Sequence, residues 1–459
     1  MKKSFFVLIC ILVACSKDVD SSPEVNNTTQ EPPTEQQNDN SNNQNNNNNQ
    51  NNQNSNQESS NLTFEFNYET VPSLPIHPEG LGYISINSKH YLIIPFGDLY
   101  GTTHDYLRIF EIDSVERIIR DKTFSIYDEI PEIGFSKGPL FVEDFDKDGF
   151  DDFFLVDHGQ ESSIINNRFE GDFLKFYYGS ENGFIKDQTP EISNKKLFYH
   201  HADVSDFDLD GDLDIISQRW SSQTEEIPND NTITLFKNIG NRNFEIIDLE
   251  TPAASVGSVL FSNIDNDPEL EVLSFSYGGG VVWSWDILEN QTEIINNQLG
   301  EYQIHDVVEI ENNNNSSIII FPEDYQGIET PILISTDKCE NISFMELLND
   351  FQGRDIHVID LNNDGLEDLF IYEGHNGEYP SPSYGTFIKS VLINQGNNQF
   401  SHPSNIIDTN NNLYNNEEPS THYLPIKQTP NGYLFFKFTD YSTNRYYPTG
   451  GELIDLSFD

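Results

Sequence analysis

Three short segments of the chain repeat one spacing of acidic side chains. In each of them, acidic or amide residues stand at positions one, three, five and nine of a nine-residue loop, and position six is a glycine. Such side chains can converge on one hard cation, the glycine allows a sharp turn, and the backbone carbonyl of position seven can add an oxygen, as calcium sites require. The candidate ligands are Asp144, Asp146, Asp148, Phe150 and Asp152 in the first loop, Asp206, Asp208, Asp210, Asp212 and Asp214 in the second, and Asp360, Asn362, Asp364, Leu366 and Asp368 in the third.

A fourth copy of the pattern is degenerate. It carries Asn263, Asp265, Asp267 and Glu271, with Pro268 in place of the glycine, and we expect a weaker or empty site there. Helical calcium motifs of the EF-hand type need an acid at position twelve, where this chain has Leu155, Ser217 or Ile371, so they are excluded. A plain acidic turn is the alternative for all four copies, since Asp, Asn and Gly favour turns. Without a cation, however, the three full loops would hold several carboxylates in mutual repulsion.

Short apolar strands precede and follow each loop, so each loop joins two β-strands. Copies without the metal-binding pattern begin near residues 85, 309 and 425, and together the loop starts lie 46 to 65 residues apart. Several units also carry a turn closed by an aromatic residue: Tyr178-Gly179 to Phe184, Asn238-Ile239-Gly240 to Phe244, and Asn394-Gln395-Gly396 to Phe400. Units of this length with two hairpins predict an all-β propeller of seven four-stranded blades.

These residues resemble the FG-GAP/VCBS repeat family, which includes the N-terminal propeller of integrin α-chains. The likeness covers most of residues 62–459 and is strongest in the three full loops. It implies a β-propeller, usually of seven blades, with one Ca2+ in each full loop, about three ions in all. We further expect residues 62–68 and 453–458 to be terminal strands that complete one blade and close the ring.

The N-terminal segment predicts export and a lipid anchor. Residues 1–14 read as a signal peptide, and Leu12-Val13-Ala14-Cys15 resembles the lipobox of bacterial lipoproteins, which implies acylation of Cys15. Residues 16–20 resemble the surface-export signal of Bacteroidetes lipoproteins, so we predict an outer-membrane, surface-exposed protein. The segment 15–61 is dominated by Asn, Gln, Ser, Pro and Glu, a composition typical of a disordered linker.

The charge balance limits the partners. The chain has 24 Lys and Arg against 76 Asp and Glu, a formal net charge of −52, which disfavours binding to phosphate backbones and therefore to nucleic acid. If Cys10 leaves with the signal and Cys15 carries lipid, Cys339 has no partner for an intramolecular disulfide.

A ligand face is expected at the strand ends opposite the acidic loops. The candidates there are His158, His201, Arg219, Trp220, Tyr277, His305, Arg354 and His375, which could stack on a sugar or grip a peptide, or could simply fill strand ends and the channel. No catalytic motif is recognised, and adjacent His200 and His201 cannot both join Asp203 in a metal site. We predict a module that binds glycan or protein, with a calcium-dependent glycan-degrading enzyme such as a polysaccharide lyase as the alternative.

Overall fold

A computed structural model gives the fold of the part of the chain that carries the repeats. The described residues are 62–67, 76–78, 82–98, 105–123, 132–133, 140–156, 164–165, 168–169, 174–186, 199–219, 232–250, 256–263, 270–276, 282–286, 291–296, 303–312, 315–324, 327–328, 332–336, 342–346, 355–373, 387–396, 399–401, 406–408, 421–430, 432–439 and 450–458. The predicted signal peptide, Cys15 and the predicted linker lie outside these residues. Among the described residues, no helix is long and apolar enough to cross a membrane.

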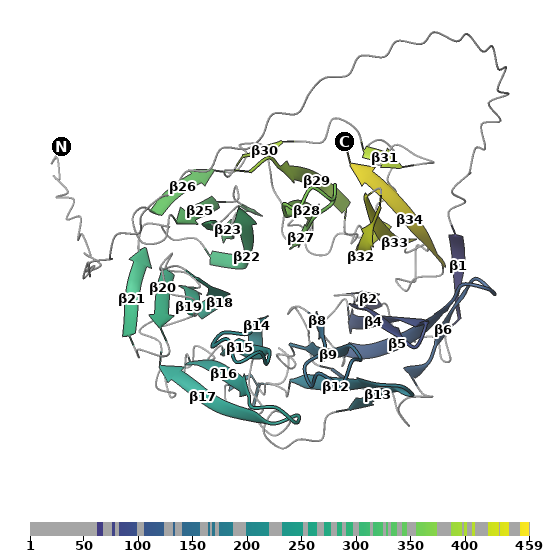
Figure 1. The fold of residues 1–459 in the computed structure, drawn as a ribbon, viewed down its shortest axis with the longest axis horizontal. Coiled ribbons are helices and arrows are strands. Elements are labelled where there is room, and N and C mark those ends of the chain that lie inside the picture. Colours follow the sequence, from purple (N-terminus) through teal and green to yellow (C-terminus); the bar gives the residue numbers. More distant parts are fainter. Residues whose placement is uncertain are drawn as a thin grey trace, which may run out of the picture. The chain divides into compact units, whose positions relative to one another are not determined.

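Five separate antiparallel sheets follow one another around a ring (Figure 1). We number them as blades 2 to 6. In each blade, every strand pairs with the strand of the same blade that follows it in the chain. Blade 2 contains β8 (Leu140–Glu143), β9 (Asp152–Leu155), β12 (Lys175–Ser180) and β13 (Gly183–Lys186), and blade 3 contains β14 (Tyr199–Ser205), β15 (Asp214–Arg219), β16 (Thr232–Asn238) and β17 (Phe244–Glu250).

The other three separate blades have the same plan. Blade 4 contains β18 (Val256–Ser262), β19 (Glu271–Ser276), β20 (Val282–Asp286) and β21 (Gln291–Asn296). Blade 5 contains β22 (Gln303–Asn312), β23 (Asn315–Asp324), β25 (Ile332–Thr336) and β26 (Ile342–Glu346), with β24 (Gly327–Ile328) beside β23, and blade 6 contains β27 (Asp355–Ile359), β28 (Asp368–Glu373), β29 (Phe387–Asn394) and β30 (Phe400–Ser401).

The two ends of the repeat region share one eleven-stranded sheet. Its first four-strand run is β3 (Gly82–Ile86), β4 (Lys89–Asp98), β5 (Asp105–Asp113) and β6 (Ile118–Asp121), and its last run is β32 (Thr421–Thr429), β33 (Gly432–Thr439), β34 (Gly450–Phe458) and β1 (Leu62–Asn67). Short strands β2 (Ile76–Pro78), β7 (Glu132–Ile133) and β31 (Ile406–Asp408) complete this sheet, and β10 (Ile164–Ile165) pairs with β11 (Arg168–Phe169) apart from it.

The strand β1 closes the ring. It pairs antiparallel with β34, with Leu62 opposite Leu453, and parallel with β6, with Glu65 opposite Ile118. The expected all-β propeller and the expected pairing of the terminal strands are therefore confirmed. Seven blades were predicted, and the structure shows five separate ones, because β1 joins the first and last runs into one sheet.

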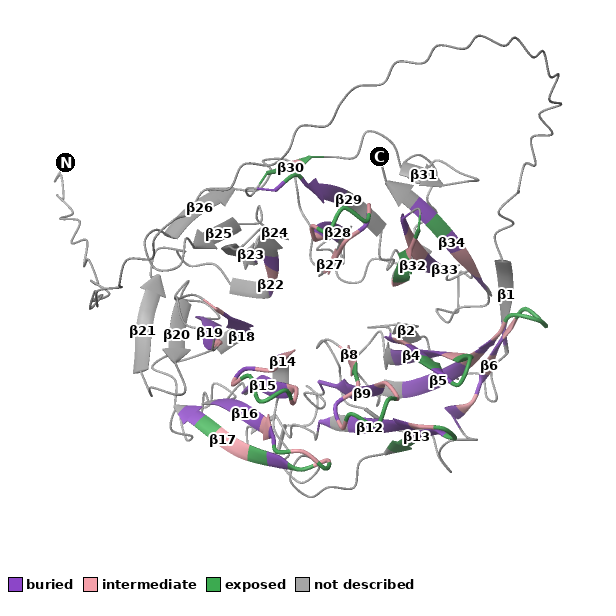
Figure 2. Ribbon diagram, viewed as in Figure 1, coloured by how far each residue is buried: buried purple, intermediate pink, exposed green. Residues whose placement is uncertain are grey.

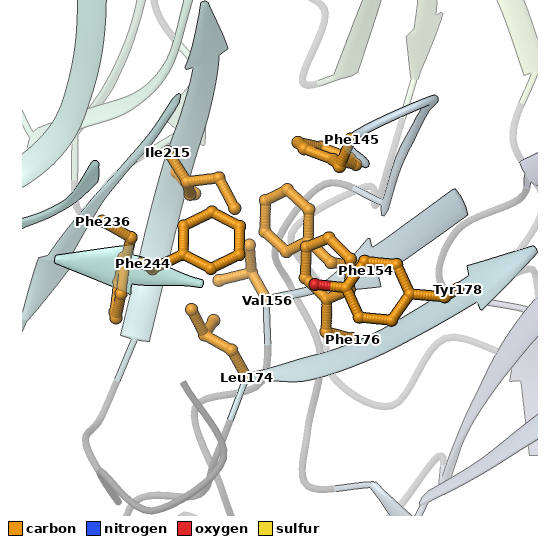
Figure 3. Close-up of a cluster of buried hydrophobic side chains, with 10 residues drawn as sticks. Phe145, Phe154, Val156, Leu174, Phe176, Tyr178, Ile215, Phe236 and Phe244 are labelled. Atoms are coloured by element: carbon orange, nitrogen blue, oxygen red, sulfur yellow. The ribbon is translucent and has the colours of Figure 1, made fainter. Parts of the chain in front are cut away.

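The hydrophobic core lies between neighbouring blades rather than on one face of each. Alternate residues of a strand point to opposite faces, and in β9 both faces are covered. Phe153 belongs to a buried cluster with side chains of the first run. Phe154 belongs to another cluster, which includes Phe236 and Phe244 of blade 3 (Figure 3). Buried residues therefore run continuously along the second strands of these blades, such as β9, β15 and β19 (Figure 2).

This architecture places the three acidic loops at equivalent points. Each one connects the first and second strands of its blade: β8 to β9, β14 to β15, and β27 to β28. The loops are therefore held at the same end of their respective blades by strands with a fixed register.

Candidate metal centre

Each acidic loop is folded around its first carboxylate. In the first loop, the backbone amides of Asp148 and Gly149 donate to Asp144 at 3.1 and 2.9 Å. In the third loop, the amides of Asp364 and Gly365 donate to Asp360 at the same two distances. In the second loop, the amide of Gly211 donates to Asp206.

The turn needs a left-handed backbone at two positions of each loop. The predicted glycines at position six have φ values of +91°, +92° and +87° (Gly149, Gly211 and Gly365). Position four is also left-handed, although it carries an ordinary residue each time: Lys147, Leu209 and Asn363, with φ of +59°, +58° and +62°. This conformation costs a residue with a Cβ about 1 kcal/mol, so other contacts must hold the loop in place.

The aspartate at position nine supplies such contacts. Asp152 is fully buried, and its two carboxylate oxygens accept from the amide of Phe145 at 2.9 Å and from the amide of Gly179 at 2.7 Å. Asp214 and Asp368 are equally buried and accept from the same two places in their own blades. The ninth residue thus ties the loop to the third strand of its blade.

The Asn-x-Gly turns, which the sequence marked only as outer hairpins, are part of the same structure. The backbone amide of Asn238 donates to Asp214 at 2.7 Å, and its side-chain amide donates to the carbonyl of Phe145 in the first loop at 2.9 Å. Asn394 donates in the same way to Asp368 at 2.8 Å, while its side chain donates to Glu367 at 3.0 Å. The sequence signal for these contacts is an Asn two residues before the glycine of each turn, Asn238 before Gly240 and Asn394 before Gly396.

Carboxylates converge in two of the loops. Oxygens of Asp144, Asp146 and Asp152 lie within 4.8 Å of one another, and so do oxygens of Asp206, Asp208 and Asp210. The third loop has Asn362 in place of one aspartate, and its side-chain amide donates to Asp364 at 2.9 Å. The fold therefore brings together three of the predicted ligands in each of the first two loops, whereas Asp148 and Asp214 are not part of these groups.

The second loop contains carboxylate oxygens that lack a partner among the described residues. The Oδ1 atoms of Asp206 and Asp208 are both buried and accept no hydrogen bond. The side chain of Asp208 is only 10% exposed. Burying an oxygen of an ionised carboxylate without a donor or a cation is costly, so this donor set fits a hard cation.

Burial also changes the acidity of the ninth residues. It raises the pKa of Asp152 to about 8, with the charges of Asp146 and Asp148 adding to the rise against the two amide donors. Burial likewise raises the pKa values of Asp214 and Asp368 to about 7. At neutral pH these carboxyl groups are therefore partly protonated, and a neighbouring cation would favour their ionised form.

The residues at position seven are held by their amides. The N–H groups of Phe150, Asp212 and Leu366 donate to the position-five carboxylates Asp148, Asp210 and Asp364 at 3.0, 3.0 and 2.9 Å. These bonds hold the peptide that precedes the carbonyl predicted as a ligand.

The degenerate copy is only partly described. Asn263 follows β18, and Glu271 begins β19 with 4% of its surface exposed. Asp265 and Asp267 lie outside the described residues. The amide of Leu270 donates to the carbonyl of Phe207 at 3.1 Å, so this segment packs against the second loop.

Of the predicted ligand face, the structure describes three residues. His201 lies in β14, and Val259 of blade 4 has its amide 3.5 Å from the His201 ring. The neighbouring Asp203 accepts from the amide of Phe261 at 2.8 Å, so this part of β14 joins two blades. Arg219 ends β15 and His305 lies in β22, whereas His158, Trp220, Tyr277, Arg354 and His375 lie outside the described residues.

Comparison with known proteins adds structural neighbours at low similarity. No protein-family model and no curated protein matches the chain. Among solved structures, the polysaccharide lyase Uly1 is 10% identical, with a TM-score of 0.40 and 85% of this chain and 92% of that chain covered. The six-bladed propeller lectin of Aleuria aurantia is 10% identical, with a TM-score of 0.36 and 74% and 94% covered. A protein from Lactobacillus plantarum is 10% identical, with a TM-score of 0.38 and 68% and 84% covered.

Proposed function

We propose that this protein is a calcium-stabilised β-propeller whose three full acidic loops each bind one Ca2+. The ion would be held by the carboxylates or amide at positions one, three, five and nine, with the carbonyl at position seven. Bound calcium would supply the positive charge that lets these acids stay ionised in a buried turn. The loops would then lock the first and second strands of their blades together.

The observation that carries the proposal is the pair of buried oxygens in the second loop. Oδ1 of Asp206 and Oδ1 of Asp208 accept no hydrogen bond from the described residues, and both residues belong to the group of three converging carboxylates. A solvated acidic turn would expose these oxygens to water, and a purely structural turn would pair them with donors.

The direct test is a metal count on the purified full-length protein by inductively coupled plasma mass spectrometry. We expect about three calcium ions per chain after dialysis against micromolar calcium, in line with sensor-type affinities. Calcium below one ion per chain, with no uptake in a titration, would mean that the loops are acidic turns and would overturn the proposal.

Calcium binding is expected to release protons. The folded pKa values of Asp152, Asp214 and Asp368 lie well above the value of about 3.9 in an unfolded chain. The metal-free native state therefore holds protons between about pH 4 and pH 8 that the unfolded chain has lost, and its free energy of unfolding falls as pH rises through this window. Because calcium takes the ionised carboxylates, binding at pH 7 should release about two protons, and calcium affinity should weaken from pH 8 to pH 6.

Isothermal titration calorimetry in two buffers of different ionisation enthalpy measures this release. The Asp152→Asn variant, which cannot lose that proton, should release about one proton fewer at pH 7. Equal binding heats in both buffers, with affinity independent of pH, would contradict the prediction.

The proposal extends to a surface role. A propeller rigidified in this way would act as a binding module for glycan or protein, anchored to the outer membrane through acylated Cys15. Arrays of glycans and peptides probed with the full-length protein would show binding without turnover, whereas new unsaturated sugar ends absorbing in the ultraviolet would establish a lyase instead. Mass spectrometry of the mature N-terminal peptide tests the anchor, and an unmodified Cys15 would exclude it.

A further inference from the structure

One hairpin turn touches both the first and the second acidic loop. Residues 239–243 connect β16 to β17 in blade 3, and we call them, together with Lys237 and Asn238 at the end of β16, the bridging turn. Toward the second loop, Lys237 forms an ion pair with Asp208, and the amide of Asn238 donates to Asp214 at 2.7 Å. Blade 3 thus holds its own loop through two residues of the turn.

The same turn reaches across to the first loop in blade 2. The Nε of Arg242 donates to Asp146 at 2.5 Å, and its Nη2 lies 3.5 Å from Asp148. The side-chain amide of Asn238 donates to the carbonyl of Phe145 at 2.9 Å. Asn238 therefore binds the second loop with its backbone and the first loop with its side chain.

The position of Arg242 is fixed by the turn and by an aromatic ring. Asn241 and Arg242 have left-handed backbones, with φ of +54° and +63°, and the Arg242 guanidinium lies 4.3 Å from the centre of the Tyr178 ring in blade 2. A stacked guanidinium keeps a planar orientation, so its bonds to the first loop are directional.

A direct ion pair also joins the two loops. Lys147, at position four of the first loop, lies with its Nζ 2.5 Å from Asp212, at position seven of the second loop. The Lys147 side chain is 52% exposed, so this pair contributes little stability by itself, but it makes the two loops immediate neighbours.

The contacts described for the third loop are of a different kind. The side chain of Asn394, the counterpart of Asn238, donates within its own blade, to the carbonyl of Glu367. Within the ranges that the structure describes, Asp360, Asp364 and Asp368 form no ion pair with a lysine or arginine. The described contact to Asp360 from the last run is Gln428, whose side-chain amide is 3.4 Å from its carbonyl.

We infer that the first and second loops form one coupled two-ion unit, in which calcium at either loop favours calcium at the other through the bridging turn, while the third loop binds independently. This inference rests on the proposed calcium sites. Ordering the bridging turn costs conformational entropy, and one turn serves both loops. The loop that binds second does not meet that cost again, which gives positive cooperativity.

Hydrogen exchange of the full-length protein, measured by mass spectrometry at graded free calcium, reports on each loop separately. Peptides covering 144–152, 206–214 and 360–368 give three calcium midpoints. We expect Asp210→Ala, which removes position five of the second loop, to raise the midpoint of the first loop about fivefold or more. The matched variant Asp364→Ala, which removes position five of the third loop, should leave the midpoint of the first loop within about twofold.

A second variant tests the route of the coupling without removing any ligand. In a Lys147→Gln/Arg242→Gln background, the effect of Asp210→Ala on the first loop should fall to less than about twofold. The control background is Lys89→Gln/Arg120→Gln, which removes two partly exposed cations whose ion-pair partners, Glu111, Asp113 and Glu116, belong to the first run, and it should keep the full effect.

The outcomes separate the two proposals. If calcium protects none of the three loops, the proposed calcium sites fail, and the coupling fails with them. If calcium protects all three loops but Asp210→Ala and Asp364→Ala act equally on the first loop, the calcium sites stand and the coupling is overturned.

Discussion

Removing calcium with a chelator is expected to lower the melting temperature of the full-length protein by about 10 °C. A site filled at one hundred times its dissociation constant stabilises the native state by about 2.7 kcal/mol, so three loops give about 8 kcal/mol. For a repeat region of about 400 residues, the entropy of unfolding converts this free energy into about 10 °C. Scanning calorimetry with and without chelator at pH 7.5 measures the shift.

Two controls make this result specific. Adding excess calcium back should restore the original melting temperature, whereas the same concentration of sodium chloride should not, because the effect belongs to a bound ion and not to screening of the −52 net charge. A melting temperature that stays within about 2 °C on chelation would be inconsistent with structural calcium in the loops.

The Asp152→Ala variant is expected to lose about 3 to 5 kcal/mol of the free energy of unfolding. The side chain is fully buried and accepts from the amides of Phe145 and Gly179, and each amide left without a partner costs about 1 to 3 kcal/mol. The variant also loses one ligand of the first loop. Urea unfolding followed by tryptophan fluorescence, with calcium present, measures the change in the midpoint.

The neighbouring Asp151→Ala variant is the matched control. Asp151 has the same charge and is adjacent in sequence, but it stands at position eight of the loop and is only partly buried. Its replacement should cost less than about 1 kcal/mol. Similar losses for Asp151→Ala and Asp152→Ala would mean that the effect comes from net charge rather than from the contacts of the ninth residue.

The propeller could be predicted from sequence because its signals are local. A glycine at position six with φ near +90° and strands directly on either side are properties of nine to fifteen consecutive residues. The pairing of the terminal strands followed from the need of a ring to close. That the first and last runs share one sheet could not be predicted, because it depends on the parallel pairing of β1 with β6. No local sequence pattern indicates that pairing.

For the candidate metal site, the sequence predicts which acidic residues converge but not what surrounds them. The convergence of Asp206, Asp208 and Asp210 follows from their spacing in one turn. The contacts of Arg242 with Asp146 and of Asn238 with Phe145 join residues more than 90 positions apart, and only the packing of blade 3 on blade 2 brings them together. The left-handed Leu209 was also missed, because leucine gives no sign of such a backbone.

Because Leu62 lies opposite Leu453, β1 has no antiparallel partner until nearly the whole repeat region has left the ribosome or the export channel. The middle blades can form hairpin by hairpin as they emerge, since their strands pair with neighbours in sequence. Closure of the ring must then be the last step of folding and the slowest contact to find. During that interval the edges of β34 and β1 that pair with each other in the closed ring are open to pairing with other chains, so the newly made protein is most prone to aggregate just before the ring closes.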